Sequence, residues 1–128
     1  MPIELKMLVF SAILALVQMV VAVLLAHSQV GLPVLVGNRE NMPALTGSAL
    51  RAQRAHLNML ESFAIFAAVV LVAQAVGRLD AMTALGAQIF FWSRLAYAVV
   101  YPVGIPWVRT AVWAVSAAGI ILVLSQLL

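Results

Sequence analysis

Four apolar stretches, almost free of charged residues, fill most of this 128-residue chain and constrain its fold more than any other feature. A helix needs about 20 apolar residues to cross the hydrocarbon core of a bilayer, so four spans with short connections use up the length available. The composition agrees, because 66% of the residues are hydrophobic and only 9% are charged. Soluble domains carry a much larger charged fraction. We therefore predict an all-α membrane protein with a bundle of four transmembrane helices and no soluble domain.

Breaks between the apolar stretches set the predicted bounds of the helices. A segment rich in glycine, proline and asparagine follows the first stretch and is predicted to be a loop. Gly77 ends the second stretch, and Pro102 ends the third. The prediction is a single domain, 1–128, with helices over 5–28, 48–76, 81–101 and 107–127 and a loop over 29–47.

The basic residues predict an orientation in the membrane. With four spans, the two termini share one side, and the long loop and the turn before the last helix share the other. That second side carries Arg39, Arg51, Arg54 and Arg109, whereas the first carries Lys6 and Arg78. The positive-inside rule then places the loop in the cytoplasm and the termini outside. We expect a multi-pass protein of a bacterial inner membrane.

Several chemistries are disfavoured by the composition. The chain has no cysteine, which excludes disulfides, thiolate metal sites and a thiol nucleophile of its own, so thiol chemistry would need an external thiol. No spacing typical of metal ligands occurs, and no metal is predicted. The basic residues lie at membrane depth and form no solvated patch, which argues against nucleic acid as a partner.

Charged residues inside the predicted helices need partners, because an unpaired charge at the bilayer centre costs at least about 2.5–3.5 kcal/mol. Glu61 lies on the second helix and Arg94 on the third. Counted from the turn that joins these helices, the two residues lie level to within roughly 3 Å. We therefore expect them to form a buried ion pair.

Polar residues also gather on one face of each of these helices. At roughly 100° per residue, each of two groups falls within a narrow arc: Arg51, Arg54, Asn58 and Glu61 on the second helix, and Arg94, Tyr97 and Tyr101 on the third. One acid neutralises one arginine, so the surplus cations, with Arg109 nearby, predict an anionic ligand. Hydrogen bonding between helices together with lipid phosphates is the alternative. His56 lies on the opposite face, where it is expected to pack or to face a neighbour.

Residues 54 to 61 read R-A-H-x-N-x-x-E, a pattern that resembles the signature of the MAPEG family, the membrane-associated proteins in eicosanoid and glutathione metabolism. The resemblance spans the whole chain: it includes the four-helix hydropathy, the loop sequence G-N-R-E-N-M-P at 37–43, Arg94 with Tyr97 and Tyr101 on the third helix, and Arg109 at the start of the fourth. It implies a homotrimer of four-helix subunits, with glutathione as co-substrate between subunits near the cytoplasmic face. The glutathione-binding residues that it implies are Arg51, Arg54, Asn58, Glu61, Arg94, Tyr97 and Tyr101.

The resemblance also implies a catalytic residue. In catalytic relatives an arginine that opens the fourth helix is thought to lie beside the sulfur, and Arg109 matches it. A fixed cation next to a thiol favours the thiolate, which is the nucleophile. Thr110 and Trp113 stand where some catalytic relatives have a serine and a tyrosine, so a hydroxyl is lost at the second position.

Two functions remain open at this point. One is a glutathione-dependent transferase or peroxidase that acts on a small lipophilic electrophile or hydroperoxide arriving from the membrane lipids. The other is a non-catalytic protein of the same fold that binds glutathione or a lipid-like ligand, or serves as a scaffold. A small multidrug exporter ranks last, because such exporters carry an acid in the first helix, where this chain offers only Gln18 at depth.

Overall fold

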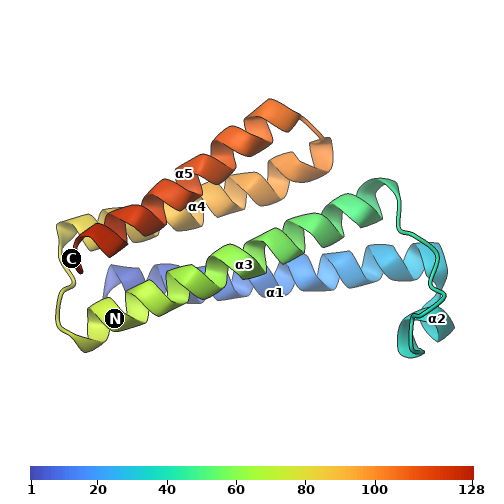
Figure 1. The fold of residues 1–128 in the computed structure, drawn as a ribbon, viewed down its shortest axis with the longest axis horizontal. Coiled ribbons are helices and arrows are strands. Elements are labelled where there is room, and N and C mark those ends of the chain that lie inside the picture. The colour runs from blue at the N-terminus through green and yellow to red at the C-terminus, as the bar shows by residue number, and fades with distance from the viewer.

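The computed structural model describes residues 1–128, except for the side chains of residues 102 and 103. Its helices are α1 (Ile3–Val30), α2 (Leu32–Val36), α3 (Gly47–Ala75), α4 (Ala81–Val103) and α5 (Pro106–Ser125). The four long helices run alternately up and down, so that both chain ends lie at one end of the bundle and α2 lies at the other (Figure 1).

The short helix α2 is the main departure from the predicted secondary structure. The sequence predicted an unbroken loop over 29–47, but that segment contains the last two residues of α1, then α2, and the first residue of α3. Gly31, with φ 83°, ends α1. Pro33 sits in the first turn of α2, where a proline costs no hydrogen bond. The glycine and the proline that suggested a loop therefore separate two helices.

Three of the helices, α1, α3 and α5, are long and apolar enough to cross a membrane. The fourth long helix, α4, has 23 residues and runs alongside them, but it carries Gln88 and Arg94 within its length. Large apolar side chains such as Ile13, Leu16 and Leu24 are exposed on α1. Exposed apolar surface of this kind is suited to lipid. A crossing by α4 remains a prediction.

The bundle consists of two helix pairs. Helix α1 packs along α3, and α4 packs along α5, while the two pairs meet through contacts of α1 with α4 and of α3 with both α4 and α5. The stacked rings of Phe66 and Phe90, with centroids 4.0 Å apart, join α3 to α4 in the centre of the core. Met59, Val70 and Val123 are completely buried around them.

Two glycines allow α4 and α5 to approach closely. A Cβ atom placed on Gly86 would lie 2.7 Å from the carbonyl oxygen of Gly119. A Cβ atom on Gly119 would lie 2.7 Å from the carbonyl oxygen of Gly86 and 2.8 Å from the backbone nitrogen of Phe90. Small residues at such a crossing let helix backbones pack directly in a membrane protein.

Hydrogen bonds tie both chain ends to the turn between α3 and α4. The hydroxyl of Thr83 donates to Glu4 Oε2 at 2.7 Å and accepts from the backbone N–H of Asp80, whose side chain in turn accepts from the N–H of Thr83. Glu4 is only 4% exposed. Arg78 Nη1 donates to the carbonyl oxygen of Leu127 at 3.2 Å. We call this set of contacts the terminal latch.

Removing the central hydroxyl of the terminal latch should destabilise the bundle. We expect Thr83→Val to lower the free energy of unfolding by about 1–3 kcal/mol, because it leaves the buried carboxylate of Glu4 without its donor. Unfolding by SDS in mixed micelles measures this loss. Thr110→Val is the matched control, since that exposed hydroxyl bonds to the Pro106 carbonyl of its own helix, and its effect should stay within about 0.5 kcal/mol. Equal losses in the two variants would contradict the role of the latch.

Candidate functional site

Arginine and tyrosine side chains stack on one another near the turn between α4 and α5. The guanidinium carbon of Arg94 lies 4.3 Å from the ring centre of Tyr97, and that of Arg109 lies 4.8 Å from the ring centre of Tyr101. The two tyrosine rings are 5.3 Å apart. Spacings of three and four residues place the α4 members on one helix face, and guanidinium groups bind well to aromatic faces. We call these four residues the arginine–tyrosine stack.

The arginine–tyrosine stack runs from the core of the bundle to its surface. Arg94 is 1% exposed and Tyr97 is 4% exposed, and both tyrosines pack against Ala55 of α3. Arg109, in the first turn of α5, is half-buried. The stack therefore connects a fully buried cation with one that solvent or a ligand can reach.

The predicted ion pair between Glu61 and Arg94 is wrong for this structure. Glu61 is exposed, and the three guanidinium nitrogens of Arg94 are buried without a hydrogen-bond partner among the described side chains. Arg94 follows its own helix to the ring of Tyr97, while Glu61 faces α5, where it shares a cavity with Trp113 and Ser116. The two side chains therefore have different neighbours in the bundle.

A cavity of about 290 Å³ opens at the outer end of the arginine–tyrosine stack. Its walls come from three helices: Asn58 from α3, Tyr97 from α4, and Arg109, Thr110 and Trp113 from α5. Asn58 Oδ1 is buried and has no hydrogen-bond partner among the described residues. This cavity, the Arg109 cavity, therefore combines a cation, a phenol, a hydroxyl and an unsatisfied amide, a set suited to an anionic, hydrogen-bonding ligand.

A second cavity of about 180 Å³ lies next to the first, because Asn58 and Trp113 line both. It follows the contact between α3 and α5, with Glu61 and Ser62 on one wall and mostly apolar residues on the rest. We call it the α3–α5 cavity. Together the two cavities place a polar compartment beside a largely apolar one, with the indole of Trp113 at their junction.

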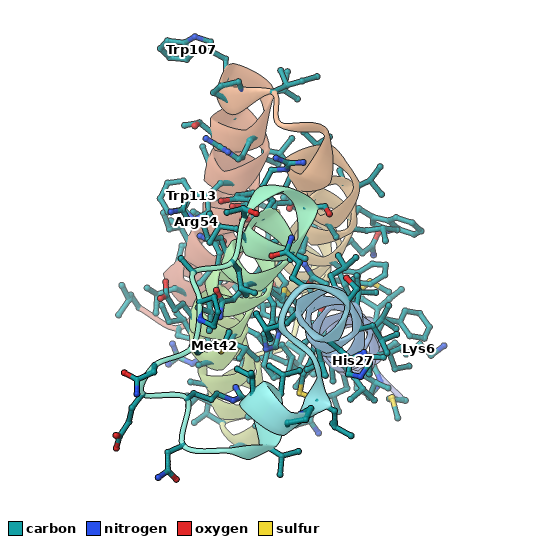
Figure 2. The ribbon with its side chains drawn as sticks, turned by 90° about the vertical axis from the view of Figure 1, so that its right-hand side faces the viewer. Lys6, His27, Met42, Arg54, Trp107 and Trp113 are labelled. Atoms are coloured by element: carbon teal, nitrogen blue, oxygen red, sulfur yellow. The ribbon has the colours of Figure 1, made fainter. Side chains whose placement is uncertain are left out.

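The predicted site residues are only partly gathered around these cavities. Asn58, Tyr97 and Arg109 line the Arg109 cavity, and Glu61 lines the adjoining one. Arg94 and Tyr101 reach it through the arginine–tyrosine stack. The last two predicted residues, Arg51 and Arg54 of α3, line neither cavity, the first being half-buried and the second exposed. In the end-on view, Arg54 lies on the same side of the bundle as Trp113 (Figure 2).

Sequence reasoning missed some of the lining residues. Ser62 and Ser116 line the α3–α5 cavity, although neither was predicted as a site residue. The helical period carries the signal for one of them, since Ser116 lies seven residues after Arg109 on the same face of α5. Trp113 was noted only as a missing hydroxyl, whereas its side chain forms a wall of both cavities.

Apolar spanning helices packed as an antiparallel bundle, with a cationic and aromatic cavity near one end, define an integral membrane protein of the small helical-bundle class. Comparison with protein-family profiles matches residues 7–128 to the MAPEG family. The chain belongs to the MAPEG family, which confirms the resemblance seen in residues 54 to 61. Searches of curated proteins and of solved structures gave no match.

Proposed function

We propose that the protein is a glutathione-dependent membrane transferase or peroxidase that acts on lipophilic electrophiles or hydroperoxides. The observation that carries this proposal is the Arg109 cavity, where a cation, a phenol and an unsatisfied amide converge beside a more apolar space. Membership of the MAPEG family supports a place in glutathione or eicosanoid metabolism.

The residues at the site match the functional groups of glutathione. The tripeptide carries two carboxylates, one ammonium group, two peptide bonds and a thiol. Arg109 supplies a cation for the sulfur, Asn58 an amide for the peptide backbone, and Glu61 a carboxylate for the ammonium group. Arg51 and Arg54 supply further cations on α3 for the carboxylates. The Arg109 cavity is at the lower limit of volume for a small-molecule site, which agrees with a site completed by a neighbouring subunit of the proposed homotrimer.

Arg109 is the proposed catalytic residue. Its guanidinium group stabilises the glutathione thiolate, which attacks an electrophilic carbon, so that a carbon–sulfur bond forms and the leaving group departs with its electron pair. With a hydroperoxide, the thiolate sulfur attacks the outer oxygen, so that an S–O bond forms as the O–O bond breaks, which gives a sulfenic acid and an alkoxide that takes up a proton to become an alcohol. A second glutathione then attacks the sulfenic sulfur, which forms the disulfide as the hydroxyl group leaves as water. Tyr97 lines the same cavity, and in this proposal its hydroxyl donates a further hydrogen bond to glutathione.

The assembly and location follow from the same reasoning and belong to this proposal. Three copies of the chain form the trimer in a bacterial inner membrane, surrounded by lipid. The termini face outward, and the α2 segment and the turn between α4 and α5 face the cytoplasm. The distribution of arginine supports this orientation, because Arg39, Arg51, Arg54 and Arg109 all lie toward the α2 end.

Thermal unfolding of the detergent-purified protein tests the proposed binding. At a glutathione concentration about 100 times the Kd, we expect binding to stabilise the folded state by about 2.7 kcal/mol. S-Methylglutathione should stabilise the protein in the same way but should support no turnover, because its sulfur cannot form a thiolate. Conjugation of a chlorodinitrobenzene and reduction of an organic hydroperoxide are measured on the same preparation. Absence of both stabilisation and turnover would refute the proposal.

A non-catalytic binding protein is the second candidate. One observation favours it: the indole of Trp113, which is 45% exposed, separates the two cavities and offers no hydroxyl to the sulfur. Such a protein would bind glutathione or a lipid-like ligand, or act as a scaffold, without chemistry. Stabilisation by glutathione without conjugation or peroxide reduction in the assays above would identify this function.

A further inference from the structure

A third pocket, separate from the two cavities above, lies between α1, the α2 segment and α3. Its volume is about 210 Å³. The lining residues that matter here are Met19 and Val23 of α1, Arg39 and Met42 of the segment between α2 and α3, and Gln53 and His56 of α3. His56 lies two residues from Asn58 and on a different face of α3, so the α2 pocket and the Arg109 cavity open on different sides of that helix.

The walls of the α2 pocket are held in place by contacts that a plain loop would lack. Gln29 clamps the far end of the segment, since its side chain donates to the Thr46 carbonyl at 2.7 Å and accepts from the Thr46 N–H at 3.1 Å. The apolar cluster of Ala26, Leu45 and Ala49 lies beneath the segment. The pocket is therefore part of the folded structure.

Arg39 is fixed in an unusual conformation beside this pocket. Its φ of 64° makes it the one non-glycine residue with a positive φ in the described chain. Such a conformation is strained for a residue with a side chain, and residues of this kind cluster at functional sites. The Nε atom donates to the Leu35 carbonyl at 2.8 Å, which holds the guanidinium group while its two terminal nitrogens remain for another partner.

The imidazole of His56 is a second polar group in the pocket. His56 Nδ1 is buried and makes no hydrogen bond to the described residues. A buried polar atom without a hydrogen bond destabilises the free protein, so a ligand that bonds to it binds more tightly. The α2 pocket therefore combines the cation of Arg39, the imidazole of His56 and the amide of Gln53. Apolar side chains such as Met19 and Val23 line the rest of it.

We propose that the α2 pocket binds the anion of a long-chain fatty acid taken from the bilayer. The carboxylate would lie against the terminal nitrogens of Arg39 in a two-pronged contact and accept a hydrogen bond from His56. The acyl chain would follow Met19 and Val23 along α1 toward the membrane interior. One cation calls for one negative charge, and about 210 Å³ is below the usual size of a site that encloses a whole ligand, so the pocket would hold the carboxylate end while the single chain lies along the outside of the bundle. This site is independent of the proposed glutathione function.

Photolabelling of the full chain in phosphatidylcholine nanodiscs tests this proposal. The probe is palmitic acid with a diazirine in its chain, and labelled peptides are mapped by mass spectrometry. We expect labelling of the α1 segment 19–26 to fall about tenfold or more with the probe's methyl ester and in Arg39→Asn. Asparagine tolerates the left-handed backbone, so this variant removes the charge without new strain. Arg78→Asn, at the other end of the bundle, is the matched control and should label normally.

The other outcomes decide the question either way. Equal labelling by the methyl ester or in Arg39→Asn would show contact with membrane chains only and overturn the proposal. Stronger labelling by a diazirine lysophosphatidic acid would assign the pocket to a phosphate group. Loss of labelling on adding glutathione would assign the pocket to the glutathione site. Either result would overturn the proposal of a fatty-acid site. Should Arg39→Asn fail to fold, Arg39→Lys must keep most of the labelling. Thermal stabilisation by glutathione is read separately, so failure of one proposal leaves the other distinguishable.

Discussion

Replacement of Arg109 by alanine is expected to lower kcat/KM for conjugation by about two orders of magnitude. Arg109 is the cation that lines the Arg109 cavity, and the substitution leaves the glutathione thiolate without an adjacent positive charge. Loss of one preorganised electrostatic contact to a reacting atom costs roughly 10²–10³ in kcat. The variant also removes the guanidinium group that stacks on Tyr101. Steady-state kinetics with a chlorodinitrobenzene measures the effect.

Two further variants serve as controls for the Arg109→Ala result. Arg109→Lys keeps the charge but lacks the planar group that lies on the tyrosine ring, so we expect activity between those of the wild type and the alanine variant. Arg78→Ala removes an arginine at the opposite end of the bundle and should leave kcat/KM unchanged. Full activity in Arg109→Ala would exclude the proposed thiolate stabilisation. If the wild-type protein binds glutathione but shows no turnover, the non-catalytic function is correct.

The second large effect concerns folding. We expect Gly119→Leu to lower the free energy of unfolding by about 3 kcal/mol or more, because its Cβ would meet backbone atoms of Gly86 and Phe90 at 2.7 and 2.8 Å. Backbone cannot move aside as a flexible side chain can, so α4 and α5 must separate. SDS titration in mixed micelles, with circular dichroism as readout, measures the change.

Gly37→Leu provides the control for the glycine crossing. Gly37 has an ordinary backbone conformation at the exposed end of α2, and its nearest contact for a Cβ is 3.4 Å. We expect its substitution to cost about 0.5 kcal/mol or less. If Gly119→Leu were equally mild, the close approach of α4 and α5 would not contribute to stability as described.

The long helices were predictable because hydropathy alone reports whether a segment can lie in lipid. Helix α2 was not, since Gly31 and Pro33 give the same signal for a loop as for a break between two helices. The glycine crossing was also missed. Nothing in the residues around Gly86 or Gly119 indicates that these two positions, far apart in the chain, meet face to face.

The sequence predicted several residues of the candidate site, but it did not predict the contacts between them. Counting along the helices predicted one height for Glu61 and Arg94, but height says nothing about the direction in which a side chain points around its helix. The α3 side chain that packs on the tyrosines is Ala55, one residue from Arg54 in the predicted polar stripe. A sequence shows which residues share a face of one helix. It does not show which neighbouring helix that face meets, because packing between helices decides this.

The position of the terminal latch bears on which side of a membrane the polar cavity faces. Hydrogen bonds of Glu4, Thr83 and Arg78 hold one end of the bundle together, and Arg109 lies in the first turn of the last helix, so the polar cavity lies toward the opposite end. A bundle that crosses a bilayer lengthwise therefore presents its cavity end to the solutes of one compartment. Which compartment that is depends on the way the chain was threaded during synthesis, so a reversal of insertion would leave every contact intact and change the pool of reactants.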